Sequence, residues 1–148
     1  MVRYRYSGRT DQTKAAVKRW LDAEALRKEH RWRGAMYVAG YVIECKLKAS
    51  LMEIYDLDTL EELDGELERR LGKRVDVFTH SIEVLFNLTN ARDRMIGSAK
   101  GTSALRAFQL CNTWDPAWRY RPDDGLESDC ATFMASVKEF RDFIDHNV

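Results

Sequence analysis

Apolar side chains recur every three or four positions along most of the chain, the spacing that is typical of amphipathic α-helices. The pattern predicts a first helix over about residues 11–31 and a second over about residues 33–55. The second helix is apolar on nearly every side. Such a helix is usually central, with neighbours on several faces. Two adjacent helices of this length indicate an antiparallel hairpin.

A short acidic helix is predicted next, within about residues 56–76. Thr59 and Glu62 form a capping box at its start, and Gly72 supplies a stop signal at its end. The helix carries five acidic side chains and few apolar ones: Glu61, Glu62, Asp64, Glu66 and Glu68. We therefore expect a solvated acidic insertion.

The remaining helices are predicted from the same apolar spacing. One covers about residues 79–96, the glycine-containing segment 97–101 breaks the pattern, and another helix covers about residues 102–112. Asp115 followed by Pro116 predicts a single helical turn, and Asp124 with Glu127 predicts the cap of the last helix. That helix carries an apolar seam with 4-3-4-3-4 spacing: Leu126, Cys130, Phe133, Val137, Phe140 and Ile144.

These elements predict an all-α protein, an antiparallel up-down helical bundle with an acidic helical insertion. No segment longer than a few residues alternates with the period of two that strands require. The 148 residues are the length of one domain, so we expect a single domain over residues 1–148.

The charge balance is neutral overall but uneven along the chain. There are 24 basic and 24 acidic side chains, which argues against a globally basic nucleic-acid binder. Residues 1–50 nevertheless carry 12 basic and 5 acidic side chains, a surplus of +7. This positive third favours either a phosphate-bearing partner or pairing with the acidic remainder of the chain.

Several classes of protein are excluded or disfavoured. No apolar run approaches the roughly 20 residues of a membrane span, and the N-terminus lacks the apolar region of a signal peptide. Three widely spaced cysteines, Cys45, Cys111 and Cys130, indicate reduced thiols and a cytoplasmic protein. The segment 97–103 lacks the spacing of a phosphate-binding P-loop. The three histidines are far apart in the sequence, so we expect no metal and no cofactor.

Glu44 is the unusual residue of the second helix because apolar residues surround it on both sides in the sequence. A carboxylate in such a position needs a partner if it is buried. We expect Glu44 to pair with an arginine from another helix, to reach the rim of the bundle, or to shape a polar pocket.

Three segments resemble HEPN domains. They are Ala35-Met-Tyr-Val-Ala-Gly-Tyr-Val-Ile-Glu-Cys-Lys-Leu-Lys-Ala49, His80-Ser-Ile-Glu-Val-Leu and Trp114-Asp-Pro-Ala-Trp-Arg-Tyr-Arg-Pro122. Together they span most of the chain in the order that the family has. The resemblance implies a dimeric bundle of four or five helices in a superfamily named for nucleotide binding. Many members are RNases of toxin–antitoxin and phage-defence systems, and others pair with a nucleotidyltransferase antitoxin.

HEPN nucleases carry an arginine followed by a histidine four to six residues later, and Arg141 and His146 fit that spacing. In such sites the histidine would act as acid or base and the arginine would stabilise charge on the phosphorane. On a continuous helix, however, five residues turn these two side chains about 140° apart.

Arg119 and Arg121 match the family better. They flank Tyr120 and could bind phosphate while aromatic rings stack on a base. Alternatively one of them pairs with Glu44, and the nearby Trp114 and Trp118 fill the core.

The sequence thus predicts a homodimeric HEPN-like domain that binds RNA, a nucleotide or a partner protein, in a toxin–antitoxin or defence setting. Two alternatives remain: a metal-independent endoribonuclease using Arg141 and His146, and a purely structural interaction domain. We also predict a direct ion pair between Glu44 and Arg119 or Arg121.

Overall fold

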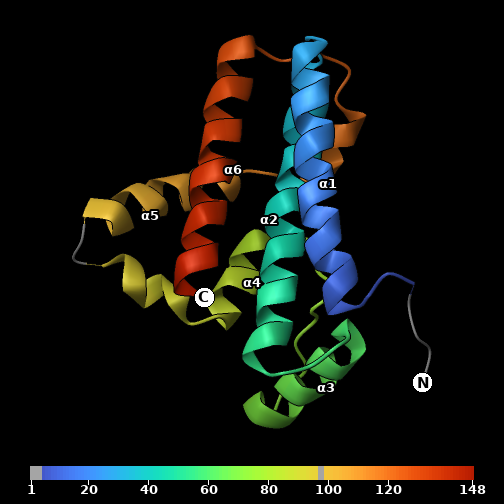
Figure 1. Cartoon of the computed structure of the whole chain (residues 1–148), viewed down its shortest axis with the longest axis vertical. Helices are drawn as coiled ribbons and strands as arrows, with labels where there is room; N and C mark the ends of the chain where they lie inside the picture. The colour runs from blue at the N-terminus through green and yellow to red at the C-terminus, as the bar shows by residue number, and fades with distance from the viewer. Residues whose placement is uncertain (1–4, 97–98) are drawn as a thin grey trace.

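The computed structural model describes residues 5–96 and 99–148, and every regular element in these residues is a helix. Three long helices, α1 (Arg9–Lys28), α2 (Trp32–Ile54) and α6 (Glu127–Asn147), run side by side along the molecule (Figure 1). α1 and α2 form the antiparallel hairpin that the sequence predicts, and α6 packs on α2. The all-α helical bundle is therefore confirmed.

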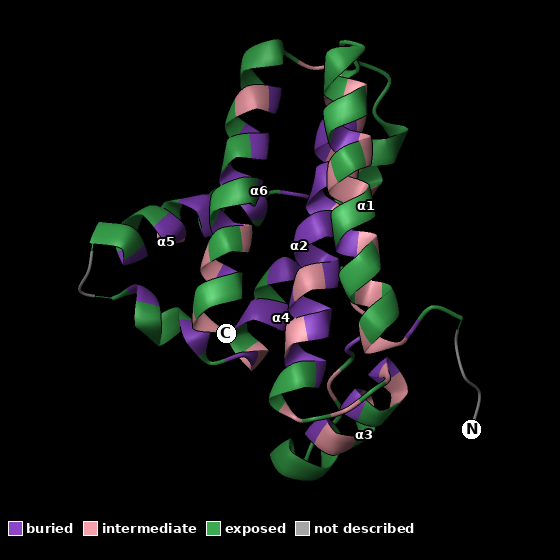
Figure 2. Ribbon diagram, viewed as in Figure 1, coloured by how far each residue is buried: buried purple, intermediate pink, exposed green. Residues whose placement is uncertain are grey.

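α2 is the central helix. It is buried along most of its length, whereas α1 and α6 each turn an exposed face outward (Figure 2). Ala35, Ala39 and Ile43 are fully enclosed, and the small alanines let neighbouring helices approach closely. The helix with apolar residues on nearly every side thus occupies the position that its pattern predicts.

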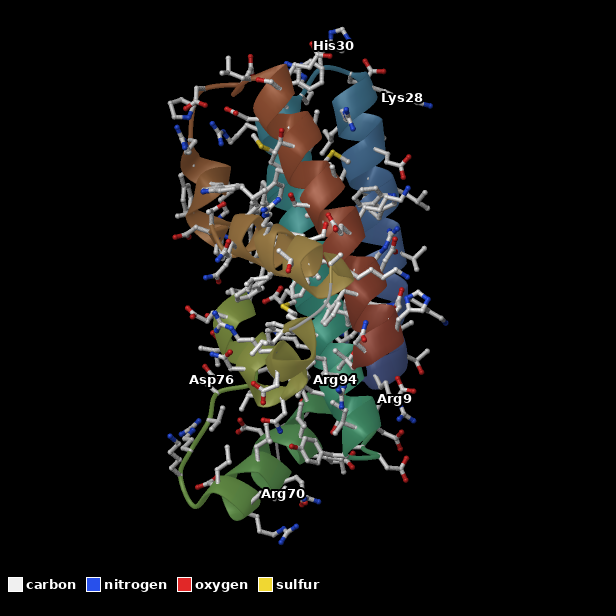
Figure 3. The ribbon with its side chains drawn as sticks, turned by 90° about the vertical axis from the view of Figure 1, so that its left-hand side faces the viewer. Arg9, Lys28, His30, Arg70, Asp76 and Arg94 are labelled. Carbon is white, nitrogen blue, oxygen red and sulfur yellow. The ribbon has the colours of Figure 1, made fainter. Side chains whose placement is uncertain are left out.

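The acidic insertion forms α3 (Leu60–Leu71). Its predicted ends are confirmed: the Thr59 hydroxyl accepts a hydrogen bond from the Glu62 N–H at 3.2 Å, and Gly72 adopts φ +68°. The expectation of a solvated excursion is wrong because one face of α3 is buried, and that face consists of Leu60, Leu63 and Leu67. The charged side chains lie away from that face, and the guanidinium of Arg70 (labelled in Figure 3) lies 4.9 Å from the centroid of the Tyr55 ring.

The single helix predicted over residues 79–96 is instead two short elements, α4 (Ile82–Leu88) and a 3-10 turn η1 (Ala91–Met95). The Thr89 hydroxyl donates a hydrogen bond to the Phe86 carbonyl at 2.6 Å and closes α4. Asn90 then adopts the left-handed conformation, with φ +59°, which asparagine tolerates better than most residues. The apolar spacing continues through Asn90, so the sequence pattern gives no sign that the helix ends there.

α5 (Ala99–Cys111) begins three residues before its predicted start at residue 102. The predicted break at residues 97–101 falls partly on residues 97–98, which lie outside the described residues. Gly101 is inside the helix, where a Cβ atom would come within 2.2 Å of the Met95 carbonyl oxygen. This glycine therefore permits a close backbone approach instead of ending a helix.

The turn predicted at Asp115 and Pro116 is confirmed as η2 (Pro116–Tyr120), and the Asp115 carboxylate accepts a hydrogen bond from the Ala117 N–H at 2.8 Å. The predicted cap of the last helix is wrong: α6 starts after Leu126, and the Asp124 carbonyl accepts instead from the Arg33 N–H. The rest of the apolar seam is buried against the other helices, namely Cys130, Phe133, Val137, Phe140 and Ile144.

Candidate functional site

Glu44 lies in the interior of the molecule, where its side chain is 5% exposed. The Lys48 ammonium, one turn further along α2, donates a hydrogen bond to a Glu44 carboxylate oxygen at 3.2 Å. The same oxygen is in short contact with Nδ1 of His80. The predicted ion pair with Arg119 or Arg121 is therefore wrong, because Lys48 and His80 occupy the carboxylate.

His80 reaches Glu44 from the connection between α3 and α4. This connection rises from α3 past Asp76 along the edge of the molecule (Figure 3). Buried Val77 anchors it, and the Ser81 N–H donates to the Thr79 hydroxyl at 3.1 Å. The His80 side chain remains 55% exposed, so its ring joins a buried carboxylate to the solvent.

Two tyrosines continue this arrangement along α2. The ring of Tyr41 lies perpendicular to that of His80, with 6.1 Å between the centroids, and its hydroxyl is 3.2 Å from the hydroxyl of Tyr37. Burial raises the pKa of Tyr41, and the hydrogen bond with Tyr37 and the nearby Glu44 charge raise it further. Tyr41 is consequently a neutral phenol at physiological pH.

Trp114 attaches the segment after α5 to the same face of α2. Its indole N–H donates to the Tyr37 carbonyl at 2.9 Å, and its ring packs edge-on against Tyr41 with 4.8 Å between centroids. The indole lies directly on Gly40, where a Cβ atom would come within 2.2 Å of the ring. Trp114, which is 6% exposed, is therefore a packing residue.

Arg119 and Tyr120 form the exposed end of the site, on η2. The Arg119 guanidinium lies 4.7 Å from the centroid of the Tyr120 ring. Hydrogen bonds with the side chains of Tyr120 and Tyr37 raise the pKa of Arg119. We call the whole arrangement the polar–aromatic cluster; its members are Tyr37, Tyr41, Glu44, Lys48, His80, Trp114, Arg119 and Tyr120. It presents a cation, an imidazole and aromatic rings on one side of the molecule.

Arg121 does not take part in the cluster. Its side chain is 3.3 Å from the Asp123 carboxylate, which also binds Arg33 at 2.8 Å. This pairing lowers the pKa of Asp123, with the Arg33 hydrogen bond as the main cause. Of the two arginines that flank Tyr120, only Arg119 is thus available to a ligand at the cluster.

The structure does not bring Arg141 and His146 together within one chain. α6 is continuous through both residues, so they lie on different faces. The Arg141 guanidinium stacks 4.9 Å from the Trp20 ring centroid, and Nδ1 of His146 donates to the Asp142 carbonyl at 2.6 Å. They line separate cavities, of about 590 Å³ and 760 Å³ respectively.

Four site residues were not predicted from the sequence: Tyr37, Tyr41, Lys48 and His80. The first three share a pattern that could have revealed them, because with Glu44 they recur along α2 at 4-3-4 spacing. That spacing places four polar or aromatic side chains on one face of a largely apolar helix. His80 has no comparable signal, since it is 36 residues from Glu44 and lies in an irregular connection.

Comparisons with protein-family models, with curated proteins and with solved structures found no match to this chain. Within residues 5–96 and 99–148, no group of three or more histidine, cysteine, aspartate or glutamate side chains is placed to hold a metal ion. No helix in this part of the chain is long and apolar enough to cross a bilayer.

Proposed function

We propose that the protein is a binding domain for RNA or nucleotides and that its ligand occupies the exposed side of the polar–aromatic cluster. The observation that carries the proposal is Arg119, an exposed guanidinium that lies 4.7 Å from the centroid of the exposed Tyr120 ring. A guanidinium binds a phosphate through paired hydrogen bonds, and the neighbouring tyrosine rings offer surfaces on which bases stack.

The HEPN resemblance supports the same proposal. Each of the three resembling segments contributes side chains to the cluster: Tyr37, Tyr41, Glu44 and Lys48 come from the first, His80 from the second, and Trp114, Arg119 and Tyr120 from the third. Segments that are far apart in the sequence thus meet at one place. A toxin–antitoxin or defence role is part of this proposal, and growth arrest on expression, with and without neighbouring genes, tests it.

Binding is tested with a fluorescent single-stranded oligoribonucleotide and with mononucleotides, measured by anisotropy over a range of salt concentrations. We expect Arg119→Ala and Tyr120→Ala each to weaken RNA binding by roughly tenfold, about 1–3 kcal/mol for a stacked base. Arg119→Ala should also reduce the slope of log K against log salt by about 0.7, the value for one phosphate contact on a single strand.

Arg106→Ala is the matched control because Arg106 is likewise exposed but lies on α5, outside the cluster. It removes the same charge and should leave the affinity nearly unchanged. Equal losses in the control and in Arg119→Ala would indicate non-specific attraction and contradict the proposed site. Absence of RNA and nucleotide binding by the wild type would contradict the function itself.

A second candidate function, metal-independent RNA cleavage, is favoured by the contact between His80 and buried Glu44. A carboxylate that holds one imidazole nitrogen orients the other toward solvent, where it can accept a proton from a ribose hydroxyl. Cleavage assays in EDTA with His80→Ala and His146→Ala separate this site from the pair predicted from the sequence. Loss of cleavage only in His146→Ala would favour Arg141 and His146.

The homodimer remains a separate proposal. The apolar stripes of α2 and α6 could have formed an interface between two copies, but both are largely buried within one chain. An interface is still supported by two exposed apolar side chains on α1, Val17 and Leu21. Light scattering at tens of micromolar tests it, and a monomer at that concentration would count against it.

A further inference from the structure

A groove separates α1 from α6. Both helices pack on α2, and two cavities of about 590 Å³ and 540 Å³ follow one another along the space between them. The first is lined by Trp20 and Arg27 of α1 and by Met134 and Lys138 of α6. The second continues to Ile144 near the end of α6 and has Ala49 of α2 in its lining. We call the two cavities together the α1–α6 groove.

The length of the groove suits an α-helix of several turns. The lining residues of α6 extend from position 131 to position 148, which corresponds to roughly 26 Å along a helix axis. The lining residues of α1 and α6 recur at three- and four-residue spacing, so each helix turns one continuous face to the groove. A fourth helix laid between them would complete a four-helix arrangement around α2.

The lining of the groove is basic and partly apolar. Six basic residues line the two cavities, against three acidic ones, Glu24, Glu53 and Asp145. The basic residues at the first cavity are Arg27, Lys138 and Arg141, and Arg141 stacks on the indole of Trp20. An occupant that complements this lining needs apolar side chains along its centre and carboxylates at its edges.

We propose that the α1–α6 groove binds an acidic amphipathic helix of a partner protein. The apolar face of that helix packs on Trp20 and Ala135, and its glutamates or aspartates pair with Arg27 and Lys138. This interaction is independent of the ligand proposed for the polar–aromatic cluster, because the cluster and the groove share no residue although both involve α2.

Nucleic acid fits the groove less well than such a helix. Glu24, Glu53 and Asp145 are distributed among the cations and would repel a backbone that carries a phosphate at every nucleotide, whereas a helix can place its carboxylates opposite Arg27 and Lys138 alone. Three of the cations already have carboxylate neighbours, since Arg9 lies 3.5 Å from Asp58, Lys46 pairs with Asp145 and Arg141 lies 3.6 Å from Asp142. A phosphate backbone is recognised by dense, unopposed positive charge, which this groove does not offer.

The test uses a set of synthetic helical peptides of about 18 residues, long enough to span the groove. Each peptide has leucines at i, i+3, i+4 and i+7, and glutamates at varied positions on both sides of the leucine stripe. For each of them, a matched peptide carries lysines in place of the glutamates. Calorimetry with the full chain is expected to show binding of at least one glutamate peptide, at least tenfold tighter than its lysine counterpart. Trp20→Ala should reduce that affinity at least tenfold, as for an aromatic anchor in a groove.

The decisive variant reverses two exposed charges, Arg27→Glu together with Lys138→Glu, and should prefer the lysine peptide. The matched control, Lys73→Glu with Arg74→Glu, changes net charge equally on the connection after α3 and should keep the wild-type preference. Equal binding of both peptide types, or no binding of any glutamate peptide, overturns the proposal. A third result also overturns the proposal: single-stranded RNA displaces the peptide, and the variant Arg27→Glu with Lys138→Glu no longer binds that RNA. The occupant of the groove would then be nucleic acid.

Discussion

In the polar–aromatic cluster the central charge is enclosed, whereas in the α1–α6 groove the charges are mostly open to solvent. The Glu44 carboxylate is surrounded by protein and paired with Lys48 of the same helix and His80 of another segment. In the groove, Arg27 and Lys138 are exposed and lie on two helices that do not pack closely on each other. The central charges of the cluster are therefore part of the packed interior, while the charges of the groove lie on the protein surface.

This difference separates the two regions experimentally. A buried ion pair cannot lose one member without leaving the other charge unpaired, so changes in the cluster should affect stability and binding together. Exposed cations contribute little to stability, so changes of Arg27 or Lys138 in the groove should affect binding alone. The free energy of unfolding of matched variants therefore provides a test of the comparison.

The largest effect is expected for Glu44→Ala. Its removal strands the Lys48 ammonium, whose side chain is 8% exposed, and should lower the free energy of unfolding by about 3–5 kcal/mol. Urea denaturation followed by circular dichroism measures the loss. The double variant Glu44→Leu with Lys48→Met removes both charges and should recover much of the lost free energy of unfolding. If the double variant is as unstable as Glu44→Ala, lost packing and not the unpaired charge is responsible.

An intermediate effect is expected for Arg141→Ala. Its guanidinium stacks on Trp20 at the wall of the groove and is partly exposed, so its removal should cost about 0.5–1 kcal/mol. The same denaturation measurement applies, with Arg141→Lys as the control because lysine keeps the charge but stacks less well. A loss as large as that of Glu44→Ala would mean that this end of α6 is as integral to the fold as the cluster.

The smallest effect is expected for His146→Ala. The imidazole is exposed and near the end of α6, where its contact is with the Asp142 carbonyl of its own helix. The melting temperature should stay within about 1–2 °C of the wild type, because surface changes alter the free energy of unfolding by less than about 0.5 kcal/mol. His80→Ala, which removes a partner of Glu44, should lower it by more. The reverse order would contradict the ranking of the two regions.

Much of the fold could be predicted from the sequence because each long helix has a local signal. The apolar pattern located α1, α2 and α6, and Thr59 with Gly72 located both ends of α3. The corner at Asn90 escaped prediction because apolar spacing continues through it and the αL conformation of one asparagine leaves no mark on that pattern. The buried face of α3 was overlooked because its three leucines are outnumbered by charged residues.

The cluster was predictable only in part. Glu44, Arg119 and Tyr120 were identified as the polar centre, but the partner of Glu44 was assigned to the wrong cation. Lys48 could have been predicted locally, since opposite charges at i and i+4 on one helix are neighbours and attract each other. His80 could not, because its position depends on a connection held by Val77 and Thr79 and no periodicity describes such a segment.

The close contact between Gly40 and Trp114 has a consequence for recognising relatives of this protein. A glycine inside a helix costs up to about 1 kcal/mol relative to alanine, so it persists where the space of its missing side chain is occupied. Positions 40 and 114 should therefore change together during evolution: a chain that gains a side chain at position 40 must give up the tryptophan or move η2 away from α2. This linked pair, 74 residues apart, is a marker by which distant homologues can be recognised when overall similarity has faded.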